Sequence, residues 1–284
     1  MRTAILQMTS SDDPGENLAT VLAALAEAKA AGADILLTPE VTNCVSQSRS
    51  HQVAVLHPQE SDPTLAAVRD AAREARVWVL LGSLGVQSGD PDGRFANRSF
   101  LISDQGKIAG WYDKIHMFDV NVTETETFRE SDGYRPGDRA VVVRTPLATF
   151  GLSICYDMRF PALYRALAKA GAEVIAVPSS FTIPTGKAHW HALLRARAIE
   201  SQCFILAAAQ AGHHECGRDT YGHSIAISPW GEILAEADGE TTGFITARID
   251  LEAVADARRR VPSLDKDRPF EVVDLSDAAS IAVQ

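Results

Sequence analysis

The chain has 284 residues, of which 46% are hydrophobic and 23% are charged. This composition is typical of a globular protein and excludes a collagen-like or intrinsically disordered chain. Acidic residues outnumber basic ones, and the formal net charge is −10. Because the electric field of a negatively charged protein repels phosphate backbones and anionic membrane surfaces, we expect neither a nucleic-acid partner nor a membrane partner.

The cysteine content and the N-terminus both point to a reducing compartment. The chain has four scattered cysteines, Cys44, Cys155, Cys203 and Cys216, too few to staple a chain of this size with disulfides. The first residues lack the apolar stretch and the small-residue cleavage site of a secretory signal. No apolar run approaches the ~20 residues of a membrane span. We therefore expect a cytoplasmic protein.

The first third of the chain alternates short apolar runs with amphipathic windows. In the window 16–31, apolar residues recur three and four positions apart, and Gly32 follows as a stop signal. The predicted elements are a strand at 3–8, a helix at 16–31, a strand at 34–38, a helix at 63–76 and a strand at 78–82. This order favours a sheet with covering helices.

After residue 90 the pattern changes to strands separated by turn signals, such as those at 91–93 and 104–106. Helices are predicted at 161–171 and 187–201, each followed by an apolar strand, with last strands near 223–228, 233–237 and 243–249. From about residue 251 the chain is polar and charged, and we expect no further core element there. We predict one domain at 1–250 and a C-terminal tail at 251–284, which packs on the domain or on a partner subunit.

Three residues with charged or nucleophilic side chains each end an apolar, strand-like run. They are Glu40, Lys114 and Cys155. In sheet proteins with helical cover, ligand sites gather beyond strand ends, where distant segments converge. The three side chains are therefore expected to share one pocket.

Cys155 is the most informative of these residues because a helical window follows it after a short turn. Backbone N–H groups at such a turn lower the pKa of a thiol and expose the sulfur, which favours a nucleophile. The alternative is a buried cysteine that behaves as a small hydrophobe. That alternative fits Cys203, which lies in an apolar strand, and we extend it to Cys44 and Cys216.

A cysteine nucleophile needs a general base. Histidine is the usual one, and the eight histidines of the chain offer candidates. Glu40 is the better candidate if it lies in the pocket, since a carboxylate whose pKa is raised by burial can take a thiol proton. Taken alone, Glu40 fits a solvated loop carboxylate and Lys114 a surface lysine.

Three segments taken together carry a resemblance. The sequence at 35–40 is ILLTPE, at 112–120 YDKIHMFDV, and at 151–161 GLSICYDMRFP. In that order they resemble the signature segments of the nitrilase superfamily of carbon–nitrogen hydrolases, and the resemblance extends over residues 3–250. It implies a four-layer α-β-β-α sandwich in the α/β class, and at least a homodimer.

The resemblance also implies an active site. Glu40 is then the base, Lys114 the electrostatic stabiliser and Cys155 the nucleophile, and Glu130 matches a second active-site glutamate. Attack on an amide carbonyl generates an oxyanion, for which Lys114 and the backbone N–H of Tyr156 are the natural donors. No cofactor is needed for this scheme.

Several further segments look most like the Nit branch of the superfamily, in particular the amidases that act on deaminated glutathione. Because a guanidinium suits a carboxylate, we expect Arg159 to bind an anionic amide, although a structural partnership with an acidic residue is the alternative. We expect Lys187, His189 and Trp190 on a loop at the pocket mouth, with Tyr156, Arg159, His189 and Trp190 binding substrate. One departure from the branch is Lys187 after Gly186, where proline is usual.

Other interpretations of the function stay open. ω-Amidase activity on 2-oxoglutaramate and hydrolysis of an N-carbamoyl amino acid are alternatives within the superfamily. A zinc site is a rival because several histidines cluster, although no spacing matches a known zinc motif. The members of that cluster are His189, His191, His213, His214, Cys216 and His223. A catalytically silent binding protein on the same fold is the non-enzyme alternative. The glycines at 82–85 lack the spacing of a nucleotide-binding loop.

Overall fold

Two six-stranded sheets form the centre of the protein. The structure is a computed structural model and describes residues 1–122 and 127–274. The strand order is β16-β1-β2-β3-β4-β5 in the first sheet and β15-β14-β11-β10-β9-β8 in the second. In each sheet three neighbouring strands run parallel, β1-β2-β3 and β9-β10-β11, and antiparallel strands flank them.

The strands and helices have the following bounds. The first sheet contains β1 (Arg2–Gln7), β2 (Ile35–Leu37), β3 (Trp78–Gln87), β4 (Phe95–Ile102), β5 (Ile108–Asp113) and β16 (Gly243–Arg248). The second contains β8 (Val141–Arg144), β9 (Thr149–Leu152), β10 (Val174–Ala176), β11 (Phe204–Ala207), β14 (Ile225–Ile227) and β15 (Ile233–Glu236). Two small hairpins pair β6 (Asp119–Asn121) with β7 (Thr127–Arg129), and β12 (Ala211–His213) with β13 (Asp219–Tyr221). The α-helices are α1 (Pro14–Ala30), α2 (Arg49–Val55), α3 (Pro63–Ala75), α4 (Pro161–Lys169), α5 (Ile183–Ser201) and α6 (Glu252–Arg260). Short 3-10 turns are η1 (Gln59–Ser61), η2 (Glu130–Asp132), η3 (Cys155–Arg159) and η4 (Ser263–Asp265).

Alternation along the strands places one helical layer on the first sheet. Leu6 of β1 and Leu36 of β2 pack in a cluster with residues of α1 and α3. Their neighbours Ile5, Ile35 and Leu37 belong instead to the cluster that contains the second sheet. Because successive side chains of a strand point to opposite faces, the first sheet lies between these helices and the second sheet.

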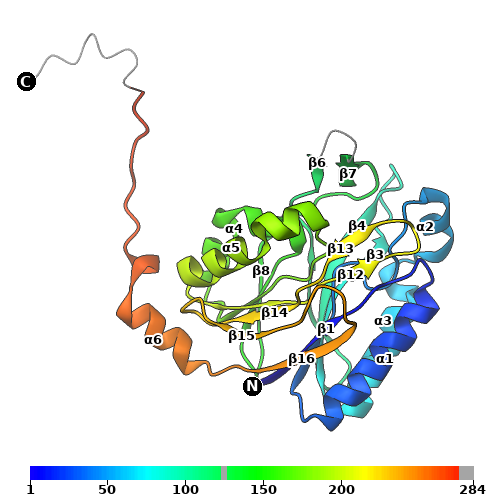
Figure 1. The fold of residues 1–284 in the computed structure, drawn as a ribbon, viewed down its shortest axis with the longest axis horizontal. Helices are drawn as coiled ribbons and strands as arrows, with labels where there is room; N and C mark the ends of the chain where they lie inside the picture. The colour runs from blue at the N-terminus through cyan, green and yellow to red at the C-terminus, as the bar shows by residue number, and fades with distance from the viewer. Residues whose placement is uncertain (123–126, 275–284) are drawn as a thin grey trace, which may run out of the picture.

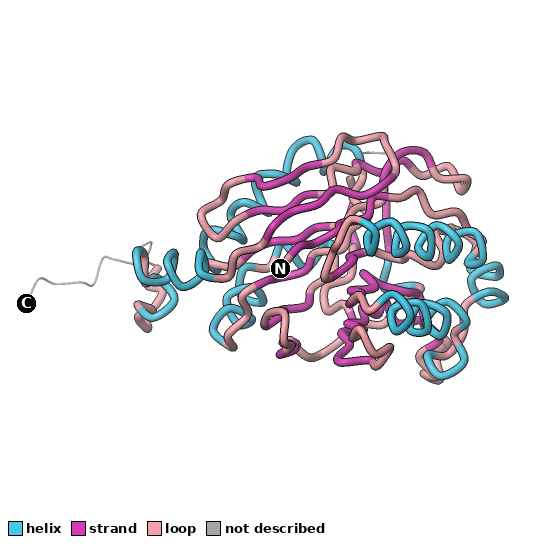
Figure 2. Tube along the Cα trace, turned by 90° about the horizontal axis from the view of Figure 1, so that it is seen from below, coloured by secondary structure: helices cyan, strands magenta, loops and turns pink. Residues whose placement is uncertain are grey.

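The second sheet is covered in the same way by α4 and α5. Tyr164 and Leu167 of α4, and Trp190 and Leu194 of α5, are buried in one cluster with β9, β10 and β11. Figure 1 shows α1 and α3 on one side of the strands and α4 and α5 on the other. Figure 2, turned by 90°, shows helices on both sides of the strands as well. The predicted four-layer α-β-β-α sandwich is confirmed.

Most predicted helices and strands form close to their predicted positions, with two corrections. The region 187–190 is not a loop, because α5 begins earlier, at Ile183. Pro184 lies in the first turn of that helix, where the missing N–H of proline is no disadvantage. The segment after residue 251 does contain a further element that packs on the core, α6, whose Val254 and Ala257 are buried. The sequence pattern did not indicate this helix, because its apolar face is short and its C-terminal end is charged.

Among the described residues, no helix combines the length and the apolar character needed to cross a lipid bilayer.

Candidate active site

The turn after β2 holds Glu40 against β3. The Thr38 hydroxyl accepts a hydrogen bond from the Gly82 N–H at 2.9 Å, and the Ser83 hydroxyl accepts one from Val41 N–H at 2.8 Å. A Cβ at Gly82 would lie 1.9 Å from the Thr38 carbonyl oxygen, so only glycine allows this approach. The Glu40 side chain is consequently held in a fixed, buried position at the end of β2.

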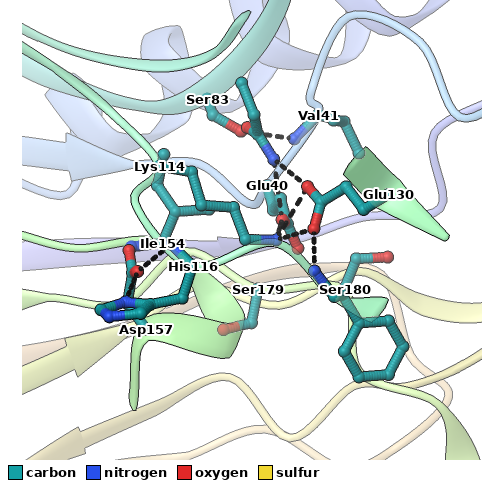
Figure 3. Close-up of polar contacts among 12 residues, drawn as sticks. Glu40, Val41, Ser83, Lys114, His116, Glu130, Ile154, Asp157, Ser179 and Ser180 are labelled. Atoms are coloured by element: carbon teal, nitrogen blue, oxygen red, sulfur yellow. Dashed lines mark hydrogen bonds and ion pairs between the residues drawn. The ribbon is translucent and has the colours of Figure 1, made fainter. Parts of the chain in front are cut away.

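Lys114 follows the last residue of β5 and points between two carboxylates. Its Nζ donates to Oε1 of Glu40 at 2.8 Å and to Oε2 of Glu130 at 2.8 Å. Its side chain is only 2% exposed. Figure 3 shows the ammonium between the two glutamates. The structure therefore brings together three of the residues predicted for the site.

Glu130 lies at the start of η2, and its carboxylate is held from several sides. Its Oε2 also accepts the backbone N–H of Phe118 at 2.7 Å. The amide nitrogen of Asn97, in β4, donates to Glu130 at 3.2 Å and to Glu40 at 3.0 Å. Asn97 thus links the two carboxylates in the same way as Lys114, and the sequence analysis did not single it out.

Cys155 begins η3, directly after the end region of β9. Its φ is 49°, in the left-handed region, and its N–H donates to the Pro178 carbonyl at 2.9 Å. The residue is 6% exposed. The thiol lies beside the Glu40 carboxylate and near the Lys114 ammonium, and both groups act on its pKa. The predicted strand-to-helix turn is present, and all three predicted strand-end residues meet there.

The Asp157 carboxylate fixes this turn from beneath. Oδ2 accepts the Ile154 N–H at 2.9 Å and the Tyr112 hydroxyl at 2.7 Å. Oδ1 accepts the His116 backbone N–H at 3.0 Å and lies 2.7 Å from its ring Nδ1. One fully buried carboxylate thereby ties the turn of Cys155 to the segment that carries Lys114.

Asp157→Asn is expected to destabilise the protein by about 3 kcal/mol. An amide accepts hydrogen bonds on one side only, so it leaves buried donors without an acceptor, each at ~1–3 kcal/mol. Chemical denaturation measures this loss. The control is Asp138→Asn, an exposed carboxylate paired only with its neighbour, for which we expect a change below about 0.5 kcal/mol. Equal stability of the two variants would contradict this role of Asp157.

The electrostatics of the site differ from the sequence expectation in two respects. Burial raises the pKa of the Cys155 thiol, and the Glu40 carboxylate raises it further, against a smaller opposing effect of Lys114. The expected lowering of the thiol pKa is therefore wrong. Burial alone would raise the pKa of Glu40, but the charge and hydrogen bond of Lys114 lower it overall. The expected rise is wrong as well, because Lys114, Cys155 and Arg218 together outweigh burial.

Lys114 shows the complementary effect. Burial alone would lower its pKa, but the carboxylates of Glu130 and Glu40 raise it well above its ordinary value. In the resting site, Glu40 is consequently ionised, Lys114 is protonated and the Cys155 thiol keeps its proton. This arrangement suits a neutral thiol that is activated by an adjacent base at the moment of attack.

A cavity of about 870 Å³ contains these groups. Its lining includes Glu40, Lys114, Glu130 and Cys155, together with Asn97, Tyr156, Ser180 and Arg218. A volume of this size is within the usual range for small-molecule sites, about 300–1,000 Å³.

The residues predicted to bind substrate lie in different places. Tyr156 lines the cavity, whereas Arg159, His189 and Trp190 are absent from its described lining. Trp190 is 0% exposed and donates its indole N–H to the His223 carbonyl, so it is a core residue. Arg159 contacts the His189 ring nitrogen at 3.3 Å, not an acidic residue. The predicted loop at the pocket mouth is thus wrong, because Lys187, His189 and Trp190 lie in α5 and outside the described lining. The substrate-binding roles of Arg159 and His189 stay predictions.

The histidines considered as zinc ligands do not converge. In the part of the chain that the structure describes, no group of three or more His, Cys, Asp or Glu side chains is placed to hold a metal ion. His191 pairs with Glu236 and His213 with Asp219, while His214 is buried between Ser10 and Thr220. On the same helix as His191, Arg197 pairs with Glu200.

Comparison with known proteins identifies the family. The profile of the carbon-nitrogen hydrolases matches residues 2–259. The chain belongs to the carbon–nitrogen hydrolase family. It is therefore an amidase-type enzyme of the nitrilase superfamily, and the resemblance inferred from the three segments is confirmed.

Individual relatives agree with this assignment. The deaminated glutathione amidase of Yersinia enterocolitica is 38% identical over 267 residues, which cover 93% of this chain and 92% of that protein. The crystal structure of the Caenorhabditis elegans NitFhit protein is 34% identical with a TM-score of 0.85, and the match covers 94% of this chain and 65% of that one. Saccharomyces cerevisiae Nit3, of branch 10 of the nitrilase superfamily, is 28% identical with a TM-score of 0.81 over 95% of this chain and 97% of its own.

Proposed function

We propose that this carbon–nitrogen hydrolase cleaves deaminated glutathione into 2-oxoglutarate and cysteinylglycine. The observation that carries the proposal is the full-length similarity to a deaminated glutathione amidase, 38% identical over 93% of this chain. The contacts among Glu40, Lys114 and Cys155 support an acyl transfer to a thiol. Similarity of this degree favours a substrate class, while the residues of the site determine the chemistry.

In the first half of the proposed reaction, Glu40 takes the proton of the Cys155 thiol as the sulfur attacks the amide carbonyl carbon. The C–S bond forms, and the carbonyl oxygen becomes an oxyanion. Lys114 and the backbone N–H of Tyr156 stabilise this charge. Glu40 then gives its proton to the amide nitrogen, the C–N bond breaks, and the amine leaves a thioester on Cys155.

In the second half, Glu40 removes a proton from a water molecule that attacks the thioester carbon. The C–S bond breaks, the carboxylic acid leaves, and the proton held by Glu40 returns to the sulfur. Glu130, fixed by Phe118 and Asn97, holds Lys114 in position and supports its protonated state throughout. Two easier steps thereby replace one difficult hydrolysis.

The size of the cavity favours deaminated glutathione over 2-oxoglutaramate. Both carry the same acyl group, but the first releases a dipeptide and the second releases ammonia. A cavity of about 870 Å³ has room for the dipeptide beyond the scissile bond. We therefore expect weaker activity on 2-oxoglutaramate, and none on simple aliphatic or aromatic nitriles.

A substrate panel tests this proposal. The measurement is kcat/KM for deaminated glutathione, 2-oxoglutaramate, an N-carbamoyl amino acid and a nitrile in one buffer, with 2-oxoglutarate, amine and ammonia release followed separately. We expect deaminated glutathione to lead by tenfold or more, ~1.4 kcal/mol in transition-state binding. A tenfold preference for the nitrile or the carbamoyl compound would refute the assignment.

The cytoplasmic location, the homodimer and the packing of the tail on a partner subunit stay predictions, and analytical ultracentrifugation checks the homodimer.

A further inference from the structure

Arg218 lies in the cavity wall without an acidic partner. Its Nη2 donates to the Ser180 carbonyl, and its guanidinium lies 5.5 Å from the centre of the Phe128 ring. Its Nε is buried and has no hydrogen-bond partner, and none of the ion pairs in the described part of the chain includes it. Buried donors are nearly always paired, so an unpaired one in a cavity wall marks a place for a ligand.

Ser180 adds a second unpaired group at the same place. The residue lines the cavity and is 3% exposed, and its buried hydroxyl has no hydrogen-bond partner. Its carbonyl accepts from Arg218, and its backbone N–H faces the Cys155 thiol. Ser180 therefore connects the nucleophile with the guanidinium, and both the Ser180 hydroxyl and the Arg218 Nε lack a hydrogen-bond partner in the protein.

The other two arginines in the described lining differ from Arg218. The guanidinium of Arg49 donates to the carbonyls of Gly133 and Gly93. That of Arg129 donates to the carbonyls of Val120 and Phe128 and to the Asn121 side chain. Neither has a buried nitrogen without an acceptor. Of these three arginines, Arg218 alone combines a position in the wall with a buried unpaired donor.

Close to the reacting groups, an anionic substrate also needs a cation. Glu40 and Glu130 face a single ammonium, Lys114, and Asp132 and Asp219 line the cavity further out. A substrate carboxylate would be repelled by these groups unless a positive charge faced it. Arg218 acts on the same region, because its charge contributes to lowering the pKa of Glu40.

We propose that Arg218, with the Ser180 hydroxyl, binds the carboxylate at the far end of the substrate acyl chain, which makes ω-amides of dicarboxylic acids the substrate class. This inference rests on the proposed function, because it places the scissile carbonyl at Cys155. A guanidinium matches a carboxylate in shape as well as in charge. We call these two groups the Arg218 carboxylate site.

The reach of the acyl chain fits this arrangement. A five-carbon acyl group places its carboxylate carbon about 5 Å from the carbonyl carbon that bonds to sulfur, at ~1.5 Å per bond along an extended zigzag. Ser180 contacts the Cys155 thiol through its backbone N–H and Arg218 through its carbonyl, so one residue separates the sulfur from the guanidinium. The terminal carboxylate of the cysteinylglycine part lies farther from the scissile bond and suits this site less.

The test compares Arg218→Gln and Arg218→Lys with Arg129→Gln, a matched control whose guanidinium is already paired in the same lining. The measurements are made at pH 8, where Glu40 is ionised in every variant. We expect Arg218→Gln to lower kcat/KM for deaminated glutathione by about 100-fold, mainly through KM, and Arg218→Lys to recover part of it. Alkylation of Cys155 by neutral iodoacetamide should change less than about threefold in all variants.

Product inhibition separates this inference from the proposed substrate. We expect 2-oxoglutarate to inhibit the wild type and Arg129→Gln but to lose about 100-fold in affinity for Arg218→Gln, while inhibition by cysteinylglycine is unchanged. If the wild type binds 2-oxoglutarate through Arg218 yet does not hydrolyse deaminated glutathione, only the proposed substrate fails. If Arg218→Gln binds 2-oxoglutarate as the wild type does, or alters cysteinylglycine binding instead, the Arg218 carboxylate site is refuted.

Discussion

Cys155→Ala is expected to reduce kcat by at least about 10⁴-fold while the protein stays folded. The variant removes the sulfur, the protein atom that bonds covalently to the substrate in the proposed reaction. Nucleophile removal in hydrolases has effects of this size or larger. Alanine keeps the Cβ atom, so the left-handed backbone at this position, with φ of 49°, is not altered. Steady-state kinetics on deaminated glutathione and thermal unfolding measure the two parts of this expectation.

The other cysteines supply the controls for this prediction. Burial raises the pKa of Cys44 to about 12 and that of Cys203 to about 11, and neither thiol is hydrogen-bonded to a carboxylate. Cys155 is distinguished by the base beside it, since its own pKa is raised as well. Cys216→Ser, in the same cavity lining, should therefore keep near-normal kcat. Full activity of Cys155→Ala, with iodoacetamide labelling Cys44 or Cys216, would reject the assignment.

The catalytic candidates could be predicted from the sequence because each follows an apolar run directly. Residues 35–37 form β2 and residues 108–113 form β5, so Glu40 and Lys114 come just beyond strand ends. Local pattern therefore gives their position along the chain. The expectation that they meet, although 74 positions apart, rests on the convergence of strand ends and on the resemblance of the three segments to a known family, not on periodicity.

The residues that were missed have contacts that no local pattern records. Asn97 begins a polar run of three residues, 97–99, inside β4, a pattern that does indicate functional or structural polar contacts, but its partners lie 57 and 33 positions away. Arg218 lies in a short polar segment next to the three-residue strand β13, too brief for a pattern to define. The contact that places Arg218 near the nucleophile is with the carbonyl of Ser180, 38 positions away.

The two errors in pKa direction have one physical origin. Residue type and burial alone predict a raised Glu40 pKa, whereas the sign depends on the 2.8 Å contact with Lys114. Similarly, backbone N–H groups at a turn predict a lowered thiol pKa, whereas the adjacent carboxylate and the depth of the cavity raise it. Electrostatic signs depend on distances between groups, which the sequence does not contain.

Lys114→Met is expected to lower kcat by about 10²–10³-fold and to destabilise the protein by about 3–5 kcal/mol at pH 8. The catalytic loss follows from removing an oxyanion donor. The stability loss follows from leaving Glu40 and Glu130 buried without their cation, since breaking a buried pair leaves an uncompensated charge. Kinetics and chemical denaturation of the purified variant measure both effects.

The pH dependence gives this prediction a distinctive sign. In the wild type the Glu40 pKa is lowered by Lys114, so the stabilisation from Glu40 is present above its ordinary pKa near 4.5 and is lost only as pH falls through the lower, folded value. Without Lys114, burial dominates and raises the Glu40 pKa, so stability is instead lost as pH rises through the raised value. Lys114→Met should therefore be more stable at pH 5 than at pH 8, and the acid limb of kcat/KM should move to higher pH.

The double variant Lys114→Met/Glu40→Gln, which removes one of the two unpaired charges, should be more stable at pH 8 than Lys114→Met alone. A single variant as stable as the wild type at pH 8, or one with no change in its pH profile, would show that Lys114 does not set the charge state of Glu40.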